Sequence, residues 1–220
     1  MHLSFEITNF DKSITLEQVI DNRARKQVVK VTSLIYWVGY YNILRGDKMR
    51  IRDADDSITE YLLEPGLYNF QQLKEAMNLL TDSITMDLNR TAGRIKITAA
   101  EGKTLKLSEN LATLLNIDPS WLSGEIFGKI DLQPFKAIYL HCDQVSASEN
   151  VFNGKPSTIL EIIPVGDKAF GSSVHIELIN ASRKTLIPGI INEFKFSIQD
   201  SAGNSINNHS LPFILTLEVN

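Results

Sequence analysis

Few residues of this chain could bind a metal or act as a catalytic nucleophile or base, and their spacing decides whether they can. The histidines are widely separated, and no HExxH, CxxC or DxDxDG pattern is present, so the sequence predicts no metal site. His141 and Cys142 are neighbours, but adjacent residues of a strand point to opposite faces, so they cannot act together as base and nucleophile. We therefore expect a structural thiol in the core and an outward imidazole. The four histidines are His2, His141, His175 and His209.

Carboxylates and glycines complete the search for a catalytic or cofactor site. Two carboxylates can serve as the acid and base of a glycosidase, but the sequence alone does not pair them. Five glutamates lie on the polar side of alternating runs, where a solvated face explains them. The glycines are scattered singly, without the GxGxxG or GxxxxGK spacing that binds phosphates. We predict neither enzyme activity nor a cofactor. The five glutamates are Glu6, Glu60, Glu177, Glu193 and Glu218.

An aromatic group at Trp37, Tyr40 and Tyr41 could stack on a sugar or a base. It lies in the most apolar run of the chain, 28–44, which also contains polar residues and is too short to cross a membrane. A buried strand therefore explains this run, and the aromatic group is interpreted as core or subunit interface.

The alternation of apolar and polar residues with a period of two recurs along the chain and predicts strands with one buried face. The turn at 89–93 joins two such runs as a hairpin, so consecutive strands are expected to be antiparallel. The long loops 146–157 and 166–172 favour a Greek-key sandwich. The clearest strands are 48–52, 84–88, 94–97, 104–107, 137–143, 174–178, 193–198 and 213–219. One core should contain Ile138, Leu140, Cys142, Ile176, Leu178, Phe194, Phe196, Ile198, Phe213, Leu215 and Leu217.

Two segments break this pattern and predict short helices. Asn69 is a good N-cap, Gln72 follows three residues later, and apolar residues recur at helical spacing over 70–80. Ser108 is the expected cap of a second helix near 109–116, before a proline at 119.

The irregular stretch between 120 and 136, with two glycines and a proline, is a soft boundary. We therefore divide the chain into an N-terminal β-rich region, 1–125, and C-terminal sandwich strands, 126–220. The N-terminal region contains both helices and is either an extra domain or a supplier of sandwich strands.

The overall composition narrows the function further. A net charge of -4 and a pI of about 5.6 leave no basic excess for phosphates, so direct nucleic-acid binding is disfavoured. A single cysteine indicates folding in a reducing compartment, the cytosol or nucleus. The N-terminus lacks the basic and apolar regions of a signal peptide, so secretion is not expected.

Several stretches together resemble a known family. Their order along the chain is more telling than any one of them. They are 138–145, the Asn153-Gly154 loop, 160–165, 196–200 with the turn at Gly203-Asn204, and 215–219, preceded by 63–68 ahead of the first helix and by 111–117. In this order the chain is similar to the penton, or minor capsid, proteins of Polinton/Maverick elements, adintoviruses and virophages.

This resemblance implies a single jelly roll, five copies of which surround each vertex of an icosahedral virion, while a double jelly-roll major capsid protein builds the faces. A closed ring needs a pair of different complementary surfaces on every subunit. Apolar loop residues are the expected subunit contacts because exposed apolar groups are costly in a monomer. They are Val151, Phe152, Phe170, Leu186 and Ile187.

The function expected from this resemblance is structural: a mainly β, jelly-roll capsid subunit found in the virion, without catalysis or cofactor. The alternative is a carbohydrate- or receptor-binding β sandwich, such as a fibre or lectin-like module, that uses Trp37 or the 146–157 loop. An enzyme on a β scaffold ranks last because no acid–base pair can be named.

Overall fold

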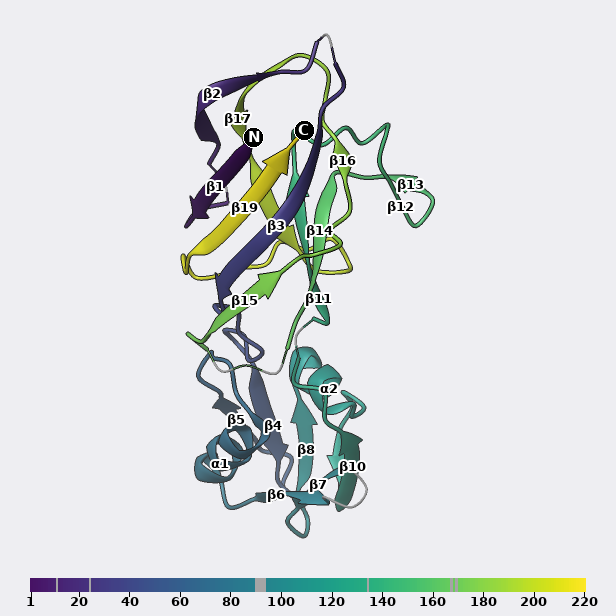
Figure 1. The fold of residues 1–220 in the computed structure, drawn as a ribbon. Helices are drawn as coiled ribbons and strands as arrows, with labels where there is room; N and C mark the ends of the chain where they lie inside the picture. Colours follow the sequence, from purple (N-terminus) through teal and green to yellow (C-terminus); the bar gives the residue numbers. More distant parts are fainter. Residues whose placement is uncertain (11, 24, 90–93, 134, 167, 169) are drawn as a thin grey trace. The chain divides into compact units, whose positions relative to one another are not determined.

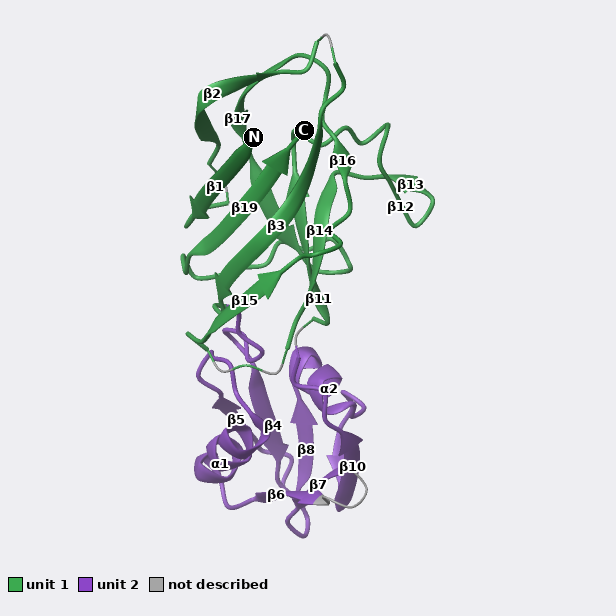
Figure 2. Ribbon diagram, viewed as in Figure 1, with its two compact units in different colours: residues 1–39, 135–220 green, residues 40–134 purple. Residues whose placement is uncertain are grey.

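The computed structural model describes residues 1–220 apart from 11, 24, 90–93, 134, 167 and 169. It divides into two compact units (Figure 1; Figure 2). Unit 1 comprises 1–39 and 135–220, and unit 2 comprises 40–134. The predicted antiparallel, mainly β architecture is confirmed in both units. Among the described residues, no helix is long and apolar enough to cross a membrane.

The larger sheet of unit 1 joins the two ends of the chain. Its order is β1-β19-β3-β15, with β16 also paired to β3, and every pairing is antiparallel. The last strand therefore lies between the first strand and β3. The bounds are β1 His2–Ile7, β3 Val28–Trp37, β15 Ser173–Glu177, β16 Lys184–Thr185 and β19 Phe213–Val219.

A second, smaller sheet of unit 1 has the order β14-β11-β18, and a two-stranded ribbon pairs β17 with β2. A short hairpin, β12-β13, projects separately. The bounds are β2 Ile14–Asp21, β11 Ala137–Cys142, β12 Val151–Phe152, β13 Lys155–Pro156, β14 Ile159–Pro164, β17 Ile190–Phe194 and β18 Phe196–Gln199.

Aromatic rings join the two sheets and the ribbon. Phe5 of β1 lies 5.7 Å from Phe194 of β17 and 5.5 Å from Phe196 of β18, between ring centroids. Of the predicted core residues, all are buried except Ile176 and Leu178, which are half-buried. The predicted face of the later strands is therefore correct.

The predicted single strand 193–198 is broken at Lys195. Its backbone N–H donates to Oε1 of Gln144 at 2.9 Å, and its carbonyl accepts from the N–H of Asp143 at 3.0 Å. The chain changes partners at this point, from β2 to β11, so Phe194 and Phe196 stay in one core while their backbones pair in different sheets.

The two units differ from the predicted division at 125/126. Strands β1 and β3 pair with β19, so the first 39 residues belong to the sandwich. Strand β10 (Glu125–Lys129) pairs with β7 (Arg94–Ala99) inside unit 2, so the inserted segment extends to 134. Strand pairings between residues so far apart in the chain cannot be recognised from local sequence patterns, so the predicted boundary differed from the observed one.

Unit 2 contains two further antiparallel sheets, of order β5-β4-β8-β9 and β10-β7-β6. The predicted hairpin turn 89–93 falls largely outside the described residues, although β6 and β7 pair up to Asn89 and Arg94. The remaining bounds are β4 Lys48–Arg52, β5 Ile58–Leu62, β6 Ile84–Asn89, β8 Thr104–Leu107 and β9 Leu122–Ser123.

Both predicted helices are present in unit 2, as α1 (Phe70–Leu80) and α2 (Glu109–Leu115). Asn69 and Gln72 form the predicted capping box of α1, and Leu73 and Met77 bury its apolar face. Ser108 is the N-cap residue of α2, but its hydroxyl donates to Asp47 instead of accepting from the helix.

A buried polar network holds the start of unit 2. The Asp47 carboxylate accepts from the Leu44 N–H at 2.7 Å, from Nδ2 of Asn110 at 2.6 Å and from Oγ of Ser108 at 2.7 Å. Asn110 also donates to the carbonyl of Asn42, whose own side chain bonds both backbone groups of Tyr68. Each member of this network is a hydrogen-bonded polar group, as burial requires.

Candidate interaction surfaces

The β12-β13 hairpin carries two of the five predicted contact residues. Asn153 and Gly154 both have positive φ, 49° and 76°, which gives the two-residue turn typical of an Asn-Gly hairpin. Val151 is 64% exposed, whereas Phe152 is half-buried with its ring 5.8 Å from that of Tyr139. The hairpin therefore displays Val151 and is anchored by Phe152.

Asn150 ties the hairpin to the segment that carries Leu186 and Ile187. Its buried side-chain amide donates to the carbonyls of Ser146 and Thr185 and accepts from the Thr185 N–H. Sequence reasoning missed Asn150 because an asparagine in a loop gives no sign of its distant partner.

The two adjacent contact candidates Leu186 and Ile187 differ in burial. Leu186 is 1% exposed and forms a backbone bridge with Val145, while Nδ2 of Asn22 donates to the carbonyls of both Leu186 and Ile187. Ile187 is exposed. Leu186 is thus a core residue, and burial removes it from any contact surface of the free chain.

Phe170 lies away from the other predicted contacts. The N–H of Gly171 donates to the carbonyl of Val38, just beyond the end of β3, while Thr185 pairs with Val28 at its start. A ten-residue strand spans about 30 Å, so Phe170 and Ile187 lie near opposite ends of β3. Phe170 is exposed, with its ring against that of His209. The structure therefore does not gather the predicted contacts in one place.

Two exposed residues of the β2-β17 ribbon extend the group around Ile187. Val19 and Ile190 are each 55% exposed, and Ile190 pairs with Asp21, which is two residues from Val19. The N–H of Asn22 donates to the carbonyl of Gly189, which holds Ile187 and Ile190 beside the end of β2. We call Val19, Ile187 and Ile190 the ribbon-end group. Val19 follows no alternation, so its exposure was not predictable from the sequence.

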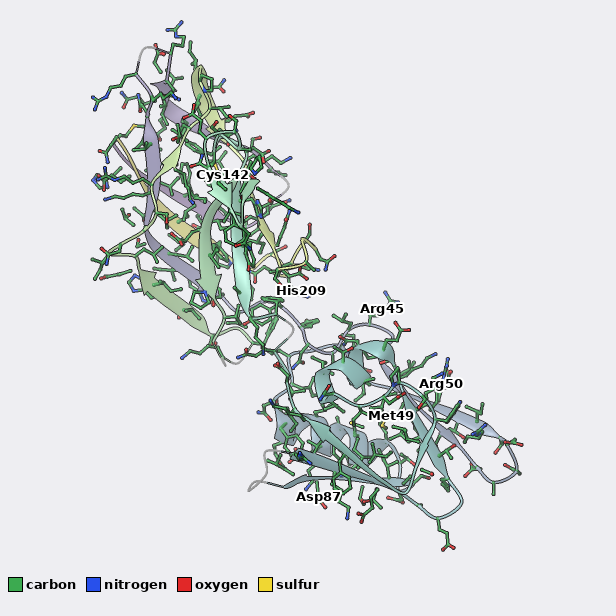
Figure 3. All side chains as sticks on the ribbon, turned by 90° about the vertical axis from the view of Figure 1, so that its right-hand side faces the viewer. Arg45, Met49, Arg50, Asp87, Cys142 and His209 are labelled. Atoms are coloured by element: carbon green, nitrogen blue, oxygen red, sulfur yellow. The ribbon has the colours of Figure 1, made fainter. Side chains whose placement is uncertain are left out.

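The residues that could do chemistry are not arranged for it. Cys142 is fully buried (Figure 3), and burial raises the pKa of its thiol to about 12, so it stays protonated. His141 is half-buried, its Nδ1 is 3.0 Å from Oγ1 of Thr158, and burial lowers its pKa. The two residues alternate in burial along β11, as predicted.

The remaining candidates are also structural or solvated. Four of the five glutamates are exposed. The fifth, Glu218, is half-buried and forms an ion pair with Lys30 at 2.7 Å. Trp37 is half-buried at the end of β3, and Tyr40 is buried. Within the described ranges, no group of three or more His, Cys, Asp or Glu side chains could hold a metal ion.

Comparisons with known proteins give the fold a counterpart. No family model matches the chain, and no curated protein is similar to it in sequence. Among solved structures, the penton protein of mavirus is similar over 100% of this chain and 98% of its own, with a TM-score of 0.52 and 12% identity. A chain of the Sputnik virophage aligns over 99% of this chain and 96% of its own, with a TM-score of 0.44 and 10% identity.

The likeness to the mavirus penton protein confirms the predicted jelly-roll fold. It extends over the full length of both chains, so it includes the inserted unit 2 as well as the sandwich. At 12% identity the likeness concerns the fold.

Proposed function

We propose that this chain is a structural capsid subunit of the penton type, five copies of which close each vertex of an icosahedral virion. The observation that carries the proposal is the full-length fold likeness to a viral penton protein. The order of the sequence stretches that resemble Polinton/Maverick, adintovirus and virophage penton proteins supports it independently.

The surface of unit 1 suits such a role. The ribbon-end group and Phe170 expose apolar side chains at well-separated places. A ring needs two different complementary surfaces on each subunit, and a few anchor side chains at the centre of such a contact supply most of its binding energy. We assign the ribbon-end group to one side of the contact and Phe170 to the other.

The experiment is co-expression with a double jelly-roll major capsid protein from the same genome, followed by electron microscopy and sedimentation. We expect closed particles whose vertices are filled only when this chain is present. The variant Val19→Asp/Ile190→Asp should leave vertices empty. Its matched control is Ile179→Asp, at an apolar residue of unit 1 that is 90% exposed and lies outside both contact surfaces.

A strictly monomeric protein that never enters particles but retains a glycan would replace this proposal with the carbohydrate- or receptor-binding module. Equal loss of vertices in the double variant and in Ile179→Asp would refute the assignment of the ribbon-end group but not the capsid role.

A further inference from the structure

The outer face of β4 in unit 2 presents a row of cations. Met49 and Ile51 are buried in the core, so the alternate residues Lys48, Arg50 and Arg52 point to the other side of the sheet. Figure 3 shows Met49 and Arg50 in unit 2. Alternate residues of a strand are about 6.7 Å apart, so the three cations form an evenly spaced line.

A fourth cation adjoins this line. Lys106 of β8 lies directly opposite Arg50, and like charges placed opposite each other in a sheet repel. Among the described residues Lys106 has no ion-pair partner within 4.0 Å. On the other side of Arg50, one carboxylate of Glu60 serves two cations, at 2.5 Å from Arg50 and 3.0 Å from Lys48. Positive charge is therefore in excess at the centre of this face.

Beside these cations, the same face of the sheet has an aromatic ring partly covered by Arg52 and two exposed aliphatic side chains. The guanidinium of Arg52 lies 4.8 Å from the centroid of the Trp121 ring, which covers one aromatic face. Among the described residues, Asp56, which is well exposed, is the one acid within 4.0 Å of the Arg52 guanidinium, at 3.9 Å. Ile58 and Leu62, on the same side of the edge strand β5, are exposed. We call Lys48, Arg50, Arg52 and Lys106 the cationic face.

These features select the chemical class of the ligand. Strand β4 is paired along both edges, with β5 and β8, so a polypeptide lying over it would find no backbone partners for its own amides. Stacking of nucleic-acid bases needs an open aromatic face, and Arg52 covers one face of Trp121. A sulfated polysaccharide needs neither backbone partners nor an open aromatic face. Its sulfates accept hydrogen bonds from guanidinium and ammonium groups, and its ring faces can pack on Ile58 and Leu62.

We propose that the cationic face binds a linear sulfated polysaccharide lying along β4. The site lies wholly in unit 2, so it is independent of the assembly role and can be tested on the isolated full chain. The chain is acidic overall, so anion binding at this face depends on its local charges and should weaken as salt screens them.

The probe is heparin, with affinity measured by calorimetry at two salt concentrations. The test variant is Lys48→Gln/Arg50→Gln/Lys106→Gln, and the matched control is Lys74→Gln/Lys96→Gln/Lys129→Gln. Both remove three charges, and two of the three side chains match in exposure, at 28% and 38% for Lys48 and Arg50 against 30% and 37% for Lys74 and Lys96. The third differs, since Lys106 is half-buried and Lys129 is exposed. We expect the test variant to bind roughly tenfold more weakly and the control to change less than about twofold.

Two outcomes overturn the proposal. One is an equal loss in both triple variants. The other is tighter binding of a single-stranded oligonucleotide or of phosphatidylserine vesicles than of heparin. The single variant Lys106→Gln, which breaks no ion pair among the described residues, covers the case in which the triple variant does not fold. It must weaken heparin binding by about threefold, and unchanged binding would also reject the proposal.

Discussion

The two units reach a stable core by different routes. Unit 1 closes through pairings between the ends of the chain, such as His2 with Glu218, and its core is built on phenylalanine rings. Unit 2 is one continuous segment, with a purely aliphatic and methionine interior at its centre and a buried polar network at its start. Long-range closure costs more chain entropy than local pairing. We therefore expect unit 2 to keep its structure when unit 1 is destabilised. Each unit also depends on a different kind of core residue.

The largest expected effect is on the aromatic core of unit 1. Phe196 is 1% exposed and its ring contacts those of Phe5 and Phe194. Phe196→Ala should therefore lower the free energy of unfolding of unit 1 by about 3–5 kcal/mol. Hydrogen exchange read peptide by peptide should show faster exchange in 1–39 and 135–220 while unit 2 keeps its protection.

The control for this variant is Phe127→Ala, at an exposed phenylalanine on β10. It should change stability by less than about 0.5 kcal/mol. If Phe196→Ala instead exposes the amides of both units to the same extent, the units unfold together and the comparison fails.

The next effect is on the polar network of unit 2. Asp47→Ala removes the acceptor of three hydrogen bonds and leaves Leu44 N–H, Asn110 and Ser108 without it. Partly buried donors that lose a charged partner should cost unit 2 about 3 kcal/mol in total. Exchange should accelerate in 40–134 only. The exposed ion pair of Asp87 with Lys74 provides the control, and Asp87→Ala should change stability by less than about 1 kcal/mol.

One site in each unit shows which features the sequence could predict. Phe194 and Phe196 were placed in the core by alternation alone, and Asn69 with Gln72 predicted the cap of α1, because both signals are local. The break at Lys195 was missed, since it depends on Gln144, which is distant in the chain.

The candidate contacts were less predictable than the strands. Leu186 and Ile187 are adjacent apolar residues whose carbonyls both accept from Nδ2 of Asn22, and the bridge of Leu186 to Val145 distinguishes the buried residue from the exposed one. The division into units was equally hidden, because the partner of β3 is the final strand. The cationic face shows the same limit: Lys48, Arg50 and Arg52 alternate visibly, but the position of Lys106 beside them follows from strand register.

A smaller effect, of opposite sign, is expected inside the sandwich. The hydroxyl of Tyr36 is buried without a hydrogen-bond partner among the described residues, while its ring stacks on Phe213 at 5.2 Å. Tyr36→Phe keeps the stacking and removes the unsatisfied group, so unit 1 should gain about 1 kcal/mol in thermal or denaturant unfolding.

Tyr68→Phe in unit 2 is the matched control. Its hydroxyl donates to the carbonyl of Glu64 at 2.9 Å, so this variant should lose rather than gain stability, by up to about 1 kcal/mol. A loss in Tyr36→Phe would show that the Tyr36 hydroxyl has a partner in solution.

The smallest effect concerns the pairing of chain ends that distinguishes unit 1. A hydrogen bond from Lys30, followed by one from Asn220, lowers the pKa of Glu218 to about 2. A carboxyl whose folded pKa lies below its unfolded value of about 4.3 stabilises the fold above that pH, and the contribution disappears as pH falls toward 2. The stability difference between the wild type and Glu218→Gln should therefore be full at neutral pH and shrink steadily between about pH 4.3 and 2. In a Lys30→Met background the same comparison should show little pH dependence, because the main cause of the lowered pKa is absent. A difference that persists unchanged to pH 2 would mean that Glu218 stabilises β19 by packing rather than by charge, and the closure of unit 1 would then owe nothing to this ion pair.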